Sequence, residues 1–318
     1  MVRQIDVFTE KDVEDILAAF EIDEEYKENM DLINRLFHPE VTLKERDIFA
    51  PQTFGDYIGQ EQAKEAAQIM IEAARIEHRP LPNIMIDGPF GLGKTTLARL
   101  ILQHANLPMR IYDGATIAQE IPTSGTIIID EIHNLPPEIS DTLNVILDQG
   151  LIHVIGCTTH LGALSGAFRS RFRSLHLEPY TVAELTTILS KVVQRKGVIA
   201  STADLTEVAK RSRFTARTGI NYLATIFDYM AVRGETVLNK STLKEVLGKI
   251  GVDANGYLKR DRQYMAALKE DRPVGLQYLE AVLNIDHDTI EEEVEPYLLR
   301  MGLIDRTPRG RIKLGEIA

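Results

Sequence analysis

The sequence predicts an α/β protein, in which a parallel sheet with crossover helices is followed by an all-helical unit and a winged helix. Three short apolar runs, at 83–88, 125–133 and 151–159, indicate buried strands. A helical pattern at 59–78 and a turn leading into a helix at 88–105 alternate with these runs. Such alternation is typical of a parallel sheet, whose ligands bind at the carboxyl ends of the strands. Polar and charged residues that could bind a ligand or take part in catalysis follow the runs at those ends.

Strand-like runs largely stop after residue 179, where the pattern becomes helical. Helices are expected over 181–197, 201–213 and 218–234, and together they make an all-helical lid domain. A third unit begins near residue 250, with helical patterns at 263–270, 275–284 and 289–302 and a short hairpin at 303–314. Three helices followed by a basic hairpin predict a winged helix-turn-helix.

An acidic segment precedes the sheet. Apolar residues recur at helical spacing over 11–20 and again over 24–37. We expect a helical extension that either caps the fold or docks a partner that the sequence does not identify. The predicted domains are the extension at 1–49, the large α/β sheet domain at 50–178, the helical lid at 179–249 and the winged helix at 250–318.

Composition and charge narrow the classes of function. The chain has 318 residues, of which 44% are hydrophobic and 26% charged, as is typical of a folded protein. Its net charge of −11 argues against a surface coated with DNA-binding charge. Residues 1–50 hold 14 of the 47 acidic residues and only 6 of the 36 basic ones. The remainder is close to neutral and can bind nucleic acid locally.

The sequence favours a cytoplasmic location. No apolar run approaches the ~18–20 residues that cross a bilayer, and the charged N-terminus lacks the apolar stretch of a signal peptide. The one cysteine, Cys157, can form neither an internal disulfide nor a cysteine-based metal site, which is consistent with a reducing compartment. We expect Cys157 to be a small buried apolar residue.

Residues 88–95, Gly-Pro-Phe-Gly-Leu-Gly-Lys-Thr, match the phosphate-loop pattern GxxxxGK[ST] between a predicted strand and a predicted helix. Gly91 and Gly93 let backbone N–H groups close around a polyphosphate, and the helix N-terminus adds partial positive charge. Lys94 supplies a full charge to the β- and γ-phosphates, and the Thr95 hydroxyl can ligate Mg²⁺. The pattern therefore predicts ATP and Mg²⁺ as cofactors.

Two carboxylates, Asp130 and Glu131, end the second apolar run. Because successive side chains of a strand point to opposite sides, the two can do different work. We expect Asp130 to hold Mg²⁺ and Glu131 to orient or deprotonate the attacking water. His133 is a weaker candidate, because such a residue more often lies at the surface or supports the site.

Further candidates lie downstream. Thr158 and Thr159 end the third run, where a hydroxyl or amide can hold the attacking water or sense the γ-phosphate, and we take Thr158 as the catalytic candidate. Arg169 and Arg171 belong to a basic cluster, which is usually a solvated face. After a nucleotide-binding core, such a guanidinium can also stabilise the γ-phosphate of a neighbouring subunit, and that requires a ring. Arg217 in the lid is expected to report the state of the nucleotide.

These residues, in this order, resemble the AAA+ ATPases, and most closely the RuvB family of Holliday-junction branch-migration motors, over residues 54–314. The phosphate loop and the run IDEIH are similar to the family's Walker A and Walker B motifs. Thr158–Thr159, Arg169–Phe172 and Thr215–Arg217 resemble its sensor 1, arginine finger and sensor 2. The segment Arg-Thr-Pro-Arg-Gly-Arg at 306–311 is the part most distinctive of RuvB.

The resemblance implies a homo-oligomeric ring, a hexamer, that hydrolyses ATP to pump duplex DNA in recombination and repair. Arg306, Arg309 and Arg311 of the hairpin would then contact the DNA backbone, although a basic hairpin can also serve solubility alone. The resemblance extends the expected nucleotide-binding set to Tyr57, Ile58, Gly88, Pro89, Phe90, Gly91, Leu92, Gly93, Lys94, Thr95, Thr96, Tyr180 and Arg217.

The chain also departs from the family. The segment between Asp130 and Thr158 is much shorter, and where the family carries a long β-hairpin that contacts RuvA, only NVILDQGLIHV remains. The family's sensor 2 sequence Gly-Thr-Pro-Arg becomes Phe-Thr-Ala-Arg at 214–217. The ATPase parts are therefore kept, whereas the shortened segment argues against a RuvA-like partner.

The leading prediction is a DNA-dependent motor that performs branch migration or a related translocation. The alternative is a ring ATPase that remodels a protein or nucleoprotein complex without RuvA and uses its winged helix to bind the partner. A nucleotide-gated scaffold is disfavoured, because a scaffold does not need Glu131. Base-specific readout is not expected, since Glu291–Glu293 of the winged helix place carboxylates where a phosphate-lined groove would lie.

Overall fold

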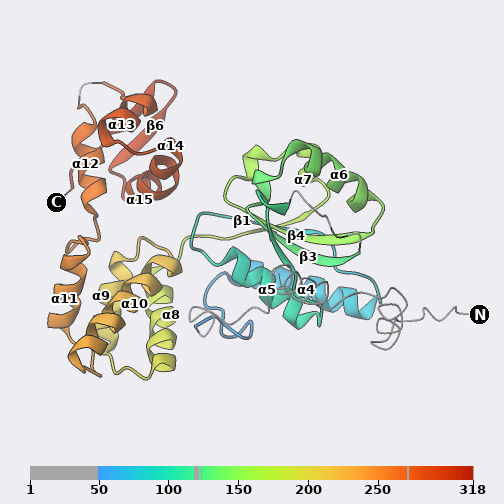
Figure 1. Ribbon diagram of the computed structural model, residues 1–318, viewed down its shortest axis with the longest axis horizontal. Helices are drawn as coiled ribbons and strands as arrows, with labels where there is room; N and C mark the ends of the chain where they lie inside the picture. Colours follow the sequence, from blue (N-terminus) through green and yellow to red (C-terminus); the bar gives the residue numbers. More distant parts are fainter. Residues whose placement is uncertain (1–48, 118–121, 123, 271, 318) are drawn as a thin grey trace, which may run out of the picture. The chain divides into compact units, whose positions relative to one another are not determined.

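The computed structural model describes residues 49–117, 122, 124–270 and 272–317 (Figure 1). The predicted helices within residues 1–48 lie outside the described part of the chain. One parallel sheet organises the ATPase domain and confirms the predicted fold class. Its strands, in spatial order, are β2 (Ile111–Asp113), β3 (Gly125–Asp130), β4 (Ile152–Thr158), β1 (Ile84–Asp87) and β5 (Arg173–His176).

Helices cover both faces of the sheet (Figure 1). One face packs on α4 (Glu61–Ile76) and α5 (Lys94–His104), and the other packs on α6 (Pro137–Asp148) and α7 (Gly166–Arg169). Within β3, Ile128 belongs to the first cluster, and Ile127 and Ile129 belong to the second. Burial on both faces explains why the inner strands appear in the sequence as continuous apolar runs.

The structure adds two strands that the apolar pattern did not reveal. β2 has three residues, and none of them is fully buried. β5 contains one buried residue, Leu175, between polar neighbours. Both lie at the edges of the sheet, where one row of backbone groups has no strand partner and little apolar surface is covered. Their assignment depends on pairing with β3 and β1 rather than on local composition.

The short segment between β3 and β4 contains no β-hairpin. Residues 131–151 form a 3₁₀ turn, η2 (Ile132–Asn134), and the helix α6, which lies against the sheet through Leu143 and Leu147. The absence of the hairpin agrees with the reduced length noted in the sequence.

The lid consists of α8 (Val182–Lys196), α9 (Thr202–Arg211), α10 (Ala216–Arg233) and α11 (Lys240–Lys249). The helical pattern predicted the first three of these helices but not α11. The first three helices begin at the side-chain caps Thr181, Ser201 and Thr215. The apolar residues of the lid continue the cluster that contains α4 and α5. The phosphate loop therefore lies where the sheet and the lid share one core.

The C-terminal unit is a winged helix with its own apolar core. It contains α12 (Lys259–Ala267), α13 (Leu276–Leu283), α14 (His287–Thr289), the π-helix η4 (Ile290–Val294), α15 (Glu295–Arg300) and the antiparallel hairpin β6 (Ile304–Thr307) and β7 (Gly310–Lys313). The sequence predicted one helix over 289–302, but Pro296 has no N–H to donate to Glu292. The turn before it widens into the π-helix, a feature frequent at functional sites. No helix of the described residues is long and apolar enough to cross a membrane.

Candidate active site

The phosphate loop connects β1 to α5, as the motif requires. Gly91 and Gly93 have φ values of +74° and +94°, which side chains other than glycine rarely adopt. A Cβ at Gly93 would lie 2.9 Å from the Tyr57 hydroxyl oxygen, so glycine is also required by space. Leu92 between them is fully buried and anchors the loop in the core.

The hydroxyl groups of two tyrosines contact the backbone of this loop. The Tyr57 hydroxyl lies 3.3 and 3.2 Å from the carbonyl oxygens of Leu92 and Gly93, and the Tyr180 hydroxyl donates to the Leu92 carbonyl at 2.8 Å. Burial raises the pKa of Tyr180 to about 12, so its proton stays available for this hydrogen bond. Both tyrosines therefore support the shape of the loop, and Ile58 beside them is half-buried.

Lys94 is 6% exposed at the start of α5. Its Nζ donates to the carbonyl oxygens of Gly88 and Pro89 at 2.8 and 3.1 Å. Burial lowers the pKa of Lys94, and the nearby Glu131 and Asp130 oppose that shift. Two carbonyl groups are weak partners for an ammonium compared with a phosphate, so Lys94 is positioned to bind a polyphosphate.

The expected metal ligands, Thr95 and Asp130, meet directly after Lys94 in the chain. The Thr95 hydroxyl donates to Asp130 Oδ2 at 2.8 Å, which joins the first turn of α5 to the end of β3. A hydroxyl and a carboxylate are hard oxygen donors that suit Mg²⁺ with several retained waters. The donor set therefore fits the cation that a nucleotide triphosphate would bring, and Thr96 follows in the same helical turn.

Glu131 stands beside this pair in a strained conformation. Its φ is +45°, a left-handed value that is uncommon without a glycine and frequent at functional sites. Its carboxylate accepts hydrogen bonds from the Thr159 N–H at 3.3 Å and from the Thr159 hydroxyl at 3.2 Å. His133 Nδ1 lies 3.4 Å from the same oxygen. The strand end thus aims a carboxylate at the space beside the phosphate loop.

The two threonines at the end of β4 have different partners. Thr158 is fully buried, shares a hydrogen bond of 3.1 Å with His133 Nδ1 and accepts one from the His160 N–H. Thr159, and not Thr158, reaches Glu131. Alternation along the strand explains this division, because adjacent side chains point to opposite sides. The sequence analysis took Thr158 as the catalytic candidate, whereas Thr159 is the residue that contacts Glu131.

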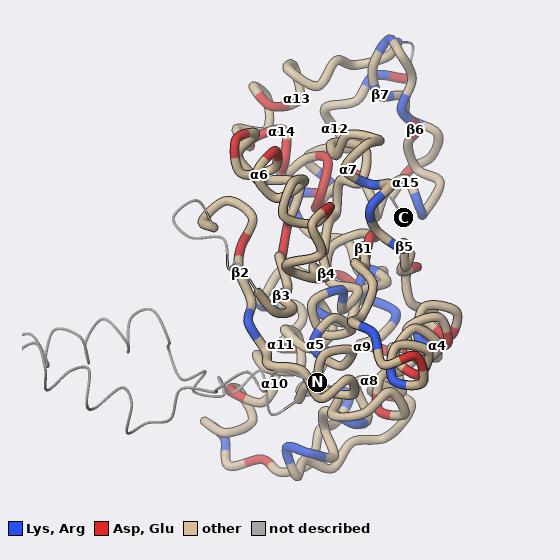
Figure 2. Tube along the Cα trace, turned by 90° about the vertical axis from the view of Figure 1, so that its right-hand side faces the viewer, with Lys and Arg blue, Asp and Glu red and all other residues tan. Residues whose placement is uncertain are grey.

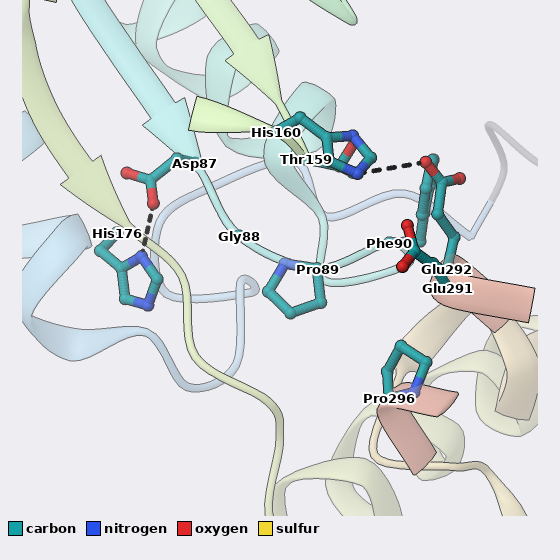
Figure 3. A pocket seen from close by; sticks show the side chains of 10 residues that line it. All are labelled: Asp87, Gly88, Pro89, Phe90, Thr159, His160, His176, Glu291, Glu292 and Pro296. Atoms are coloured by element: carbon teal, nitrogen blue, oxygen red, sulfur yellow. Dashed lines mark hydrogen bonds and ion pairs between the residues drawn. The ribbon is translucent and has the colours of Figure 1, made fainter. Parts of the chain in front are cut away.

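A cavity of about 240 Å³ lies beside the phosphate loop (Figure 3). Its wall includes a pair that the sequence analysis missed, Asp87 and His176, with His176 Nδ1 2.6 Å from Asp87 Oδ2. Asp87 ends β1 as Asp130 ends β3, so the strand-end rule could have found it. On the other wall, His160 Nε2 lies 3.5 Å from Glu292 Oε1 of the winged helix. This cavity is lined mainly by titratable and loop residues.

The three predicted arginines have unequal freedom. Arg217 is exposed at the start of α10, and its N–H donates to the Gly91 carbonyl at 3.3 Å. Arg171 is held by Asp148 through two hydrogen bonds of 2.7 and 2.6 Å. Arg169 is exposed and forms no ion pair with the described residues. The structure therefore places Arg217 at the phosphate loop and leaves Arg169 and Arg171 away from that loop's polar contacts.

The hairpin arginines also differ from one another. Arg306 and Arg311 both bind Glu295, which is fully buried, through N···O distances of 2.5 and 2.8 Å. Arg311 also pairs with Glu291. Arg309, at the turn between β6 and β7, is exposed and has no acidic partner among the described residues. Figure 2 shows Lys and Arg along β6 and β7, but much of that charge is compensated.

Comparison with known proteins agrees with this geometry. Residues 49–155 match the family model of the Holliday junction DNA helicase RuvB P-loop domain, and residues 254–314 match the RuvB C-terminal winged helix domain. The Holliday junction branch migration complex subunit RuvB of Campylobacter lari is 34% identical over 294 residues, which span 82% of this chain and 88% of that protein.

Solved structures give the same result. The structure of the Thermotoga maritima RuvB Holliday junction branch migration motor matches with a TM-score of 0.77 and 32% identity, over 84% of this chain and 95% of that one. A mutant form of the same protein matches with a TM-score of 0.78 and 31% identity over the same shares. Sequence, site geometry and fold agree, and the chain belongs to the RuvB family.

Proposed function

We propose that this chain is the ATP-hydrolysing subunit of a ring motor that moves duplex DNA at Holliday junctions or at related DNA structures. The observation that carries the proposal is that the residues expected to hydrolyse ATP lie together at the carboxyl ends of the strands. Hydrogen bonds hold each of them there: Lys94 in the phosphate loop, Thr95 with Asp130, and Glu131 with Thr159. The same chain carries a winged helix of the RuvB type.

The residues divide the chemistry among them. Lys94 and the backbone N–H groups of the loop would bind the β- and γ-phosphates. Thr95 and Asp130 would hold Mg²⁺, which supplies neutralisation of the phosphate charge. Glu131, oriented by Thr159, would take a proton from the attacking water. Tyr57 and Tyr180 support the loop, and Ile58 follows Tyr57 in the chain. We expect the adenine to bind on this side of the loop.

Ring formation is part of the proposal. Arg169 is exposed and forms no ion pair with the residues that the structure describes, as suits a residue that acts on a neighbouring subunit. Arg171 is the second candidate, and it would have to exchange Asp148 for a phosphate. We propose a homohexamer, in which one of these two arginines completes the next subunit's site.

DNA is the favoured substrate over a protein complex. Both matching family models describe parts of a DNA helicase, and the relatives are named as branch-migration proteins. Arg309 is exposed at the hairpin turn and has no acidic partner in the described part of the chain, so it can contact a phosphate. We propose that Arg306 and Arg311 mainly hold the hairpin in position and contribute to the same basic surface.

The partners differ from those of the family in this proposal. Residues 131–151 form a turn and α6 instead of a hairpin, so we propose that the motor works without a RuvA-like docking hairpin. The acidic residues 1–49 are the candidate segment for binding a different partner. We expect the protein to act in the cytoplasm.

Hydrolysis of ATP by the purified protein tests the proposal. Turnover is measured without DNA, with linear duplex and with a four-way junction, each at low and at moderate salt. A DNA motor shows stimulation by DNA that falls as salt rises, because phosphate contacts are salt-dependent. Preference for the junction supports branch migration, and turnover indifferent to all DNA contradicts the motor.

A further inference from the structure

The loop between α9 and α10 has a costly backbone. Arg213 and Phe214 are consecutive residues with φ values of +53° and +62°, and neither is a glycine. Left-handed backbone is unfavourable for residues with a Cβ, and two in succession are rarer still. Such conformations persist only where surrounding contacts determine them, and they gather at functional and switch regions.

Contacts from the winged helix hold Arg213. Its Nη1 donates to Asp261 Oδ2 at 2.6 Å, and its Nη2 donates to the Glu293 carbonyl in the π-helix at 2.7 Å. The guanidinium also lies over the Tyr297 ring, 4.3 Å from its centre. One arginine of the lid is thus bound by α12, η4 and α15 together.

Asp261 requires a cation at this position. We call the Arg213–Asp261 pair the clamp. Asp261 is 1% exposed, and its Oδ2 accepts from both Arg213 and the Leu258 N–H, whereas its Oδ1 has no hydrogen-bond partner among the described residues. A buried carboxylate needs a cation to compensate its charge. Arg213 is the cation that binds it, so the winged helix depends on this residue of the lid.

Phe214 also contacts the winged helix. Its ring lies 5.9 Å from the Tyr297 ring and 4.6 Å beneath the Arg300 guanidinium, between centres. Its carbonyl accepts a hydrogen bond from the Tyr180 N–H at 3.1 Å, so the loop also touches the tyrosine that supports the phosphate loop. The loop therefore has contacts with the winged helix on one side and with the nucleotide site on the other.

The next residues reach the phosphate loop directly. Thr215 caps α10, and the Arg217 N–H donates to the Gly91 carbonyl at 3.3 Å. A Cβ built on Gly91 would lie 3.0 and 3.1 Å from the Cβ atoms of Arg217 and Thr215, which shows how closely the two segments pack. Only three residues along the chain separate Arg213, held by the winged helix, from Arg217.

We propose that Arg213 is a positioning residue for ATP hydrolysis, through which the winged helix sets the placement of Arg217 at the phosphate loop. Movement of the winged helix on its ligand then reaches the nucleotide through this strained loop and the rigid start of α10. The inference rests on the proposed ATPase function and adds to it the route by which the two domains are coupled.

A double-mutant cycle on ATPase activity tests the route. The variants are Arg213→Gln combined with Asp261→Asn, Arg217→Gln, and the combination of all three substitutions. Removing both charges of the clamp avoids leaving Asp261 buried and uncompensated. We expect the clamp variant to lose about tenfold in kcat/KM, within the usual range of coupling between sites. The combination should be no slower than Arg217→Gln alone, and stimulation by DNA should fall in every variant.

The outcomes separate the proposal from a purely structural role. Multiplicative effects in the cycle, or a clamp variant with lower melting temperature but unchanged kcat/KM, would overturn it. Arg213→Lys keeps a cation beside Asp261 and should restore part of kcat/KM. Lys249→Gln removes an exposed lid ion pair with Glu245 and serves as the matched control. Absence of turnover in the unmodified protein would instead contradict the proposed ATPase function.

Discussion

The phosphate loop and the winged-helix hairpin are both recognised by their cations, yet the structure treats the two regions differently. In the loop, Lys94 donates to two backbone carbonyl groups, and no carboxylate of the described residues binds it directly. In the hairpin region, Arg306 and Arg311 share the buried Glu295, and Lys313 pairs with Glu316. The loop keeps its charge for a ligand, and the hairpin uses most of its charge internally.

This difference between the loop and the hairpin shows when a function can be predicted directly from a sequence motif. The loop is built from backbone N–H groups and glycines within eight residues, so its geometry is local. An arginine, by contrast, is available to DNA only if no carboxylate from elsewhere in the chain reaches it. Glu291 and Glu295 are 11 or more residues away from the arginines that they bind, and the motif does not include them.

The largest effect is expected at the nucleotide site. Glu131→Gln keeps the shape of the side chain but cannot take a proton, so turnover should fall by at least about 100-fold. Binding of a fluorescent ADP should be retained, because the phosphate loop is untouched. Steady-state hydrolysis and equilibrium titration measure the two quantities. Glu138→Gln on the exposed side of α6 is the control, and rapid turnover by Glu131→Gln would show that another group is the base.

The next effect concerns the charge compensation of the hairpin. Glu295→Gln removes the buried carboxylate that binds Arg306 and Arg311, and we expect a loss of about 3 kcal/mol in unfolding free energy. Urea unfolding measures the loss. The exposed Glu316→Gln should leave the unfolding midpoint unchanged. An unchanged midpoint in Glu295→Gln would mean that the hairpin arginines are not compensated internally, and the contrast with the loop would disappear.

A smaller effect distinguishes the arginines of the hairpin from one another. Arg309→Gln should reduce the slope of log affinity for duplex DNA against log salt by about 0.9, with no change in stability. Arg311→Gln should instead lower stability, because it removes a cation from Glu295. Binding titrations at several salt concentrations, together with urea unfolding, give both quantities. Equal slopes for the two variants would contradict the division of roles.

The smallest effect is a pH dependence at the active site. Burial lowers the pKa of His133 below its ordinary value of 6.5, so the folded protein resists protonation there. Stability should therefore fall as the pH drops from about 6.5 through the folded pKa, by about 1.4 kcal/mol for each unit of lowering. His133→Asn should flatten this part of a plot of melting temperature against pH.

Prediction from the sequence succeeded where the signal was local and strong. The three inner strands, the lid helices α8, α9 and α10, and the turn that leads into α5 all follow from short patterns. It failed at the edge strands β2 and β5, whose composition is not that of a buried strand. It also missed the π-helix before Pro296, because a helix broken by i→i+5 bonding keeps an ordinary helical pattern.

The amino-acid sequence by itself determined the chemistry of the nucleotide site and the family to which the chain belongs, because backbone-built motifs carry their geometry with them. Only the tertiary structure decided which threonine binds Glu131, which arginine of the hairpin is free, and that Arg213 joins the lid to the winged helix. These outcomes depend on side chains that are distant in sequence and meet at strand ends and buried carboxylates. Electrostatic compensation acts through space, so no local pattern could have shown it.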